Sequence, residues 1–165
     1  MHTLLVVGPQ DVQGMITHRS GWHQAKRSEL NSDFRVCIPP IVLASLQRDS
    51  SPQIALECLA SLHGQQRLQQ FRVGSLEFVS ALEIVSEKIQ AMENAGGAFT
   101  IDTIELTELE CIAFWLVFKG RYAGVEPETL VIVTGISAAA RDIITVLDAD
   151  PAALTRAHEP YPDQL

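Results

Sequence analysis

Two short apolar runs near opposite ends of the chain constrain its fold most strongly. Thr3–Val7 and Leu130–Val133 consist almost entirely of Leu, Val and Ile, and each ends at a turn containing Gly8 or Gly135. Continuous apolar runs of this length are typical of strands covered on both faces, as in parallel sheets. We therefore predict two buried strands that belong to one sheet although more than 120 residues separate them.

A third strand and several helices are predicted between these two runs. Phe34–Ile38 is mostly apolar, with only Arg35 charged, and stops at Pro39 and Pro40. Helical spacing of apolar residues follows over 41–47, over 52–64 after Ser51, and after the capping-box sequence Ser80–Glu83. Residues 10–33 indicate only a weakly marked helix and a long loop. Strands and helices thus alternate, which favours a parallel sheet with crossover helices.

The run Cys111–Phe118 is apolar on nearly every face. A helix of this kind is a buried one, so we place it at the centre of the domain, ending near Gly120 and Gly124. Ser137 is expected to cap a last helix over 138–147. We predict one domain over residues 1–147, and a polar tail over 148–165 that contains three prolines.

The composition limits the classes of function. The chain has 165 residues, 47% of them hydrophobic, and a net charge of −8. No apolar run reaches the roughly 18 residues that span a bilayer, so we expect no membrane association. The three cysteines are far apart, which favours buried thiols and a cytoplasmic location over disulfides or a zinc site. The basic cluster Arg19, His23, Lys26 and Arg27 is interpreted as a solvated loop, with a phosphate-contact patch as the alternative.

The residues that point most directly to chemistry are acidic. Glu105, Glu108 and Glu110 crowd the start of the predicted buried helix, with Asp102 just before them. Clustered carboxylates suit Mg²⁺ or Mn²⁺, which nucleases use to activate water and neutralise a phosphate. The alternative is structural: acidic side chains favour a helix N-terminus, and Glu110 would cap the Thr107 amide.

Four segments in order resemble the PIN-domain family of nucleases. They are Leu4–Val7, Phe34–Leu46, Leu106–Val117 and Val131–Ser137. The resemblance implies an α/β fold of three layers, with a mainly parallel central sheet and helices on both faces. It also implies a ribonuclease site that holds Mg²⁺ or Mn²⁺, a homodimer, and a role like that of a toxin–antitoxin component.

The chain departs from the family at most of its four acidic positions. Those positions fall at Val7 or Gly8, at Ser45, at Glu110 and at Ile136, so only the third is acidic, with Glu108 beside it. Asp11 lies a few residues after the first. The resemblance thus implies catalytic or metal-binding roles for Glu110 and Glu108, and a catalytic role for Asp11. The expected ligand pocket is formed by Gly8, Ser45, Thr134, Gly135 and Ser137.

Three functions follow as hypotheses. The first is a PIN-like domain with impaired catalysis, which requires no cofactor and binds an RNA or protein partner. The second is an active Mg²⁺- or Mn²⁺-dependent ribonuclease with an acidic site rearranged around Asp11, Glu105, Glu108 and Glu110. The third is a small-molecule-binding α/β domain, with its ligand at the carboxyl ends of the strands.

Overall fold

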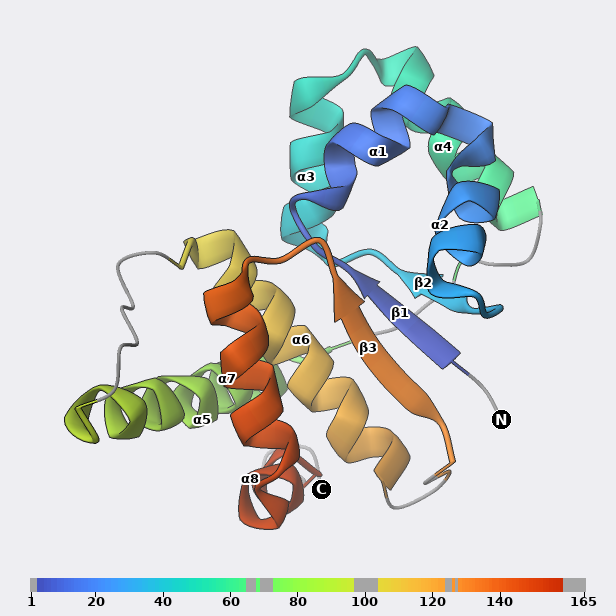
Figure 1. The fold of residues 1–165 in the computed structure, drawn as a ribbon. Coiled ribbons are helices and arrows are strands. Elements are labelled where there is room, and N and C mark those ends of the chain that lie inside the picture. The colour runs from blue at the N-terminus through green and yellow to red at the C-terminus, as the bar shows by residue number, and fades with distance from the viewer. Residues whose placement is uncertain are drawn as a thin grey trace.

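The computed structural model describes residues 3–64, 68, 73–96, 104–123, 126 and 128–158. Within them, one sheet of three strands is combined with eight α-helices and a short 3-10 helix (Figure 1). The elements in chain order are β1 (Thr3–Val7), α1 (Asp11–His18), η1 (Arg19–Gly21), α2 (Trp22–Leu30), β2 (Arg35–Cys37), α3 (Pro40–Asp49), α4 (Pro52–Gly64), α5 (Ser75–Asn94), α6 (Leu106–Ala123), β3 (Leu130–Thr134), α7 (Ala138–Asp148) and α8 (Pro151–His158).

The sheet is parallel throughout, with strand order β2-β1-β3. Leu4 of β1 lies opposite Arg35 of β2 on one side and Val131 of β3 on the other. The α/β class and the parallel sheet are thus confirmed. Because the sheet is parallel, the carboxyl ends of β1 and β3 meet at one edge, where Val7 pairs with Thr134.

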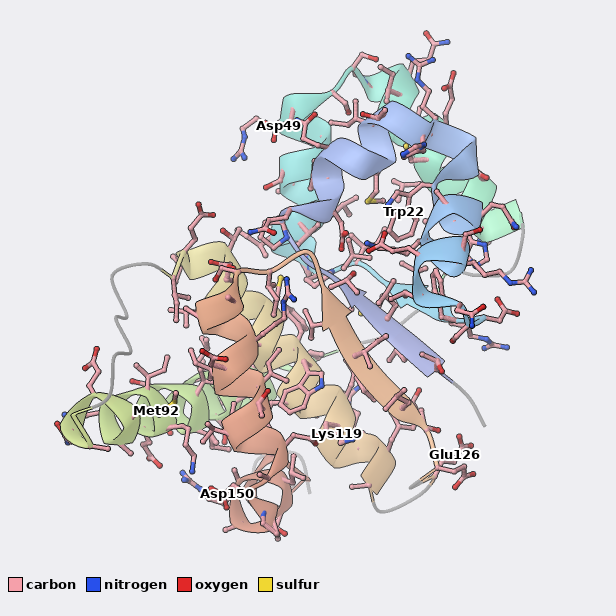
Figure 2. All side chains as sticks on the ribbon, in the orientation of Figure 1. Trp22, Asp49, Met92, Lys119, Glu126 and Asp150 are labelled. Carbon is pink, nitrogen blue, oxygen red and sulfur yellow. The ribbon has the colours of Figure 1, made fainter. Side chains whose placement is uncertain are left out.

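The strand β1 separates two hydrophobic cores. Leu5 and Val7 belong to one core, with apolar side chains from α1–α4, and Leu4 and Val6 belong to the other, with side chains from α5–α8. Alternate residues of a strand point to opposite faces, so each face of the sheet is covered by its own group of helices. Figure 1 shows these two groups on either side of the strands, and Figure 2 shows Trp22 within the α1–α4 group.

The buried helix predicted around Cys111–Phe118 is confirmed as α6, in which all eight of these residues are buried. The Trp115 indole N–H donates to the Val131 carbonyl over 2.9 Å and so fixes α6 against β3. The helix continues through Gly120 to Ala123, because apolar packing on all sides outweighs the roughly 1 kcal/mol by which one glycine disfavours a helix.

Several local predictions were wrong. Residues 11–30 are helical almost throughout, because Val12, Met15 and Trp22 pack into the core although little in their spacing marks a helix. The helix predicted to start at Ser80 starts at Ser75, where the Glu77 carboxylate accepts the Gly74 N–H.

The strand β3 and the C-terminal segment also differ from the predictions. The strand β3 is an edge strand whose first residue, Leu130, is 45% exposed, so it is not covered as completely as its sequence suggests. The predicted polar tail is helical over α8, which contacts α5, α6 and α7 and buries Ala153. The remainder of that tail lies outside the described residues.

Candidate functional site

The candidate site lies where the chain leaves β1 and β3. Here Gly8 and Gly135 allow two backbone segments to approach closely, and the Gln10 N–H donates to the Gly135 carbonyl over 2.9 Å. A Cβ on Gly8 would lie 2.3 Å from the Thr134 carbonyl oxygen. Gly135 has a positive φ of 70°, which glycine adopts readily. The two glycines expected to line a pocket are therefore used to bring the two turns together.

Asp11 begins α1 beneath these turns, and its side chain is only 6% exposed. One carboxylate oxygen, Oδ2, accepts the Thr134 hydroxyl over 2.7 Å and the Gly8 N–H over 3.3 Å. A Cβ on Gly135 would lie 2.6 Å from the Asp11 carboxyl carbon. Gly8, Thr134 and Gly135, which were predicted to line a ligand pocket, thus surround Asp11, which was predicted to be catalytic.

The other Asp11 oxygen, Oδ1, lies 2.8 Å from Nζ of Lys26, which α2 contributes. The Lys26 side chain is 9% exposed and also lies 3.5 Å from Glu29. An ion pair this deeply buried requires good geometry to offset the desolvation of both charges. Here the two hydrogen bonds to Oδ2 and the close Lys26 contact meet that requirement.

Lys26 is the central residue that sequence reasoning missed. The expected solvated loop around it is a helix, and both Lys26 and His23 are buried. His23 packs against the Phe34 ring and lies 3.8 Å from Asp33. The available signal was their i, i+3 spacing, which puts both side chains on one face of a helix.

Glu108 occupies the second part of the site and is also buried. Its Oε2 accepts the Ser137 N–H over 2.5 Å, and its Oε1 accepts the Glu105 N–H over 3.1 Å. The capping residue of α6 is therefore Glu108, acting on Glu105, and the prediction that Glu110 caps Thr107 was wrong. The helix begins at Leu106, two residues earlier than that prediction required.

Glu110 lies two residues after Glu108 in α6 and is partly buried. Its Oε2 is inaccessible to solvent and has no hydrogen-bond partner. Desolvation by burial raises the pKa of Glu110 above its ordinary value. Buried polar atoms without a partner are rare and costly in proteins, so this carboxyl is the least satisfied polar group of the site.

The Cys111 thiol is buried next to the end of β1, and the charges of three carboxylates act on it. Cys111 Sγ contacts the Val7 carbonyl at 3.8 Å. Burial, and then the negative charges of Glu110, Glu108 and Asp11, raise the pKa of Cys111 to about 12. The thiol therefore stays protonated at neutral pH and is not a nucleophile. All three cysteines are free and buried, as predicted.

The two predicted serines are placed differently. Ser137 caps α7 by accepting the Ala140 N–H over 3.3 Å, as expected, and its own N–H binds Glu108. Ser45 is buried on α3, which contacts α1 and α6, and it accepts a hydrogen bond from Arg48 of its own helix. Glu105 is exposed at the start of α6, and Asp102 lies outside the described residues.

The site contains the Asp11 carboxylate, which is paired with Lys26, and two glutamates, Glu108 and Glu110. Among residues 3–64, 73–96, 104–123 and 128–158, no three His, Cys, Asp or Glu side chains converge as a metal site would require. Asp11 interacts with an ammonium group and Glu108 with two backbone amides, so these carboxylates stabilise the fold. Of the three carboxylates, Glu110 is the one with an oxygen that has no partner, so it is the candidate for a chemical role.

Comparisons with known proteins give no relative: no protein-family model, curated protein or solved structure matches the chain. Along the described part of the chain, no helix is both long and apolar enough to cross a bilayer.

Proposed function

We propose that this chain is a three-layer PIN-like domain with impaired nuclease chemistry that acts by binding a protein partner. The observation that carries the proposal is the contact of 2.8 Å between Lys26 Nζ and Asp11 Oδ1. It supplies positive charge to the carboxylate nearest the end of β1, where the family resemblance implies a metal. The ammonium group is tethered to α2, so it competes with any free cation.

The energetics favour the internal ion pair. A divalent ion at Asp11 would displace Lys26 and leave a buried ammonium without its partner, which costs about 3–5 kcal/mol. That cost weakens metal binding roughly a hundredfold to several thousandfold. Glu108 would also have to give up the amides of Glu105 and Ser137.

Charge favours a protein over RNA as the partner. The net charge is −8, and a polyanion is repelled unless Lys and Arg side chains cluster on one surface. Within the described residues, several of the cations instead form ion pairs, namely Arg19 with Glu57, Lys26 with Asp11, Lys88 with Asp150, Lys119 with Asp148, Arg121 with Glu77 and Arg156 with Glu87.

The homodimer and the cytoplasmic location that were expected from the sequence remain predictions. Sedimentation analysis of the purified chain tests whether it forms a homodimer.

The first experiment measures melting temperature with and without Mn²⁺. We expect no shift for the wild-type chain and a stabilising shift for Lys26→Met, because the variant frees Asp11 to bind a cation. The matched control is Lys26→Met with Asp11→Asn, which should lose the response. A Mn²⁺ response in wild type as large as in Lys26→Met would contradict the proposal.

The second experiment incubates the wild-type chain with labelled single-stranded RNA and Mn²⁺. We expect no cleavage. Cleavage that Glu110→Gln abolishes would instead establish the active ribonuclease. A thermal-shift screen against nucleotides tests the small-molecule hypothesis, since a ligand at 100 times its Kd adds about 2.7 kcal/mol of stability.

A further inference from the structure

The strand β3 forms an open edge of the sheet. It pairs with β1 on one side only, and in Figure 1 both β1 and β2 lie on that side. The other border of the sheet is partly covered, because Val36 of β2 forms a parallel bridge with Leu68. Among the described residues, no strand or bridge pairs with the outer side of β3. We call the outer side of Leu130–Thr134 the β3 edge.

The backbone of the β3 edge has polar groups available for pairing. Successive residues of a strand direct their N–H and C=O groups to opposite sides, so about half of these groups face away from β1. Apart from the ladder with β1, the described residues make one hydrogen bond to the backbone of Leu130–Thr134, from the Trp115 indole to the Val131 carbonyl. A carbonyl oxygen has two lone pairs, so Val131 can still accept another bond. The outward backbone groups can therefore pair with a further strand.

The side chains of β3 do not protect this edge. Natural edge strands avoid pairing with other chains through Lys, Pro or a β-bulge. The run Leu130–Thr134 contains neither residue, and it pairs with β1 in continuous register, without a bulge. Leu130 is 45% exposed, and Ile132, Val133 and Thr134 are partly exposed. An added strand would therefore cover apolar side chains as well as pair backbone groups.

Two charged side chains flank the β3 edge, one at each end. Glu128 is exposed just before the strand and forms no ion pair with a described residue. Beyond the other end, Arg141 of α7 is exposed and donates to the Ile136 carbonyl over 3.2 Å, and it too forms no ion pair with a described residue. The next residue, Asp142, lies about 100° further round α7 and faces another way. The edge thus has a negative charge where β3 begins and a positive charge where it ends.

This distribution of charge is complementary to itself when two copies of β3 run antiparallel. Pairing centred on Ile132 places Leu130 of one copy opposite Thr134 of the other. It also directs Glu128 of each copy toward the end of the strand at which Arg141 of the other copy lies. A twofold axis repeats both contacts, whereas parallel pairing would bring like charges together. The charges therefore favour a second copy of this chain, in antiparallel orientation, as the added strand.

We propose that two copies of this chain associate through the β3 edge, with their β3 strands antiparallel and centred on Ile132. The two sheets then form one continuous sheet in the order β2-β1-β3-β3-β1-β2. Self-association of this kind is separate from the partner-binding function proposed above, so either can fail without the other. Pairing across one short strand buries little surface, so we expect a dissociation constant on the order of 10 µM.

The first test is sedimentation velocity of the full chain at physiological ionic strength. It should show a monomer–dimer equilibrium over concentrations that bracket about 10 µM. Leu130→Lys should weaken association at least about tenfold, because an edge lysine would lose its hydration on pairing. Leu56→Lys is the matched control and should associate like the wild-type chain, because Leu56 is 65% exposed on α4 and the change of charge is the same.

An exchange of charges tests the orientation of the strands. Glu128→Arg and Arg141→Glu each place like charges opposite one another, so each alone should weaken association roughly threefold or more. The double variant restores opposite charges and should associate within about twofold of the wild-type chain. General repulsion between two negatively charged copies predicts instead that Glu128→Arg strengthens association, because it lowers the net negative charge.

A new cysteine tests the register. Two Ile132 side chains lie opposite each other in the centred register, so Ile132→Cys should form a disulfide between copies, with oxidised glutathione as the oxidant. Leu130→Cys is the control: position 130 is more exposed, but in this register it lies about 13 Å along the strand from its counterpart. It should therefore cross-link at least about tenfold more slowly. The three native cysteines are buried.

Four results would overturn the inference. The first is a chain that stays monomeric up to about 200 µM, well above the expected dissociation constant. The second is a dimer that Leu130→Lys leaves unchanged, since its interface would lie elsewhere. The third is a double charge variant that associates as weakly as the weaker of the two single variants. The fourth is cross-linking of Leu130→Cys as fast as that of Ile132→Cys, which would exclude the centred antiparallel register.

Discussion

Lys26 Nζ lies 2.8 Å from Asp11 Oδ1 in a position where both side chains are at least nine-tenths buried. This contact joins α2 to the first turn of α1. Through Thr134 and Gly8 it also ties α1 to the ends of β3 and β1. Removing either charge therefore leaves the other buried without its closest oppositely charged partner.

The ion pair should show strong coupling in a double-mutant cycle. We expect Asp11→Ala to lower the free energy of unfolding by about 3–5 kcal/mol, because the buried Lys26 side chain would lose its closest partner. The double variant with Lys26→Met should be destabilised by clearly less than the sum of the single effects. The free energy of unfolding is measured by urea denaturation for the wild-type chain, the two single variants and the double variant. Additive effects would show that the two charges do not stabilise each other.

The close approach of the two turns should make Gly135→Ala strongly destabilising. The new methyl group would lie 2.6 Å from the Asp11 carboxyl carbon, and alanine is disfavoured at the Gly135 φ of 70°. Strain and overpacking together should cost roughly 2–5 kcal/mol in urea denaturation. Gly64→Ala is the control, since nothing lies within 4 Å of its added Cβ. Equal stability of the two variants would contradict the placement of Asp11.

The unsatisfied carboxyl of Glu110 should make stability depend on pH. Burial raises its pKa in the folded chain above the ordinary 4.5, so the ionised form destabilises the fold at neutral pH. Glu110→Gln should therefore raise the melting temperature at pH 7. The gain should shrink as pH falls through the folded-state pKa and vanish below about 4.5, where the carboxyl is protonated in both states. A gain that is constant from pH 7 to pH 4 would show that the charge of Glu110 is not the cause.

The buried thiols should resist modification in the folded chain. Burial raises the pKa of Cys37, Cys58 and Cys111, the last to about 12. A thiol reagent such as Ellman's reagent should react with none of them within minutes at pH 8. In urea it should react with all three. Rapid reaction of one thiol without urea would show that its packing is looser than the structure describes.

Local sequence information suffices for the elements that are apolar on every side and for two helix caps. The strands 3–7 and 130–134 and the apolar helix around Trp115 were predictable, because continuous apolar runs can be satisfied only by burial. Ser51 and Ser137 were also predictable as helix caps, since capping depends on residues three positions apart. Residues 11–30 were not, because their apolar side chains are few and their helices are stabilised by packing into a core shared with α3 and α4.

For the candidate site, the sequence by itself determined which carboxylates and glycines were present, and that two buried strands of one sheet end at Gly8 and at Thr134 and Gly135. The structure decided that these two strands are neighbours. Only the tertiary structure decided what those groups do. It gave Asp11 an ammonium partner 15 positions along the chain and gave Glu108, rather than Glu110, the capping role. The physical reason is that the role of a charged group depends on which opposite charge and which amides lie within about 3 Å of it. That distance is set by how helices pack on the sheet, which no short sequence pattern encodes.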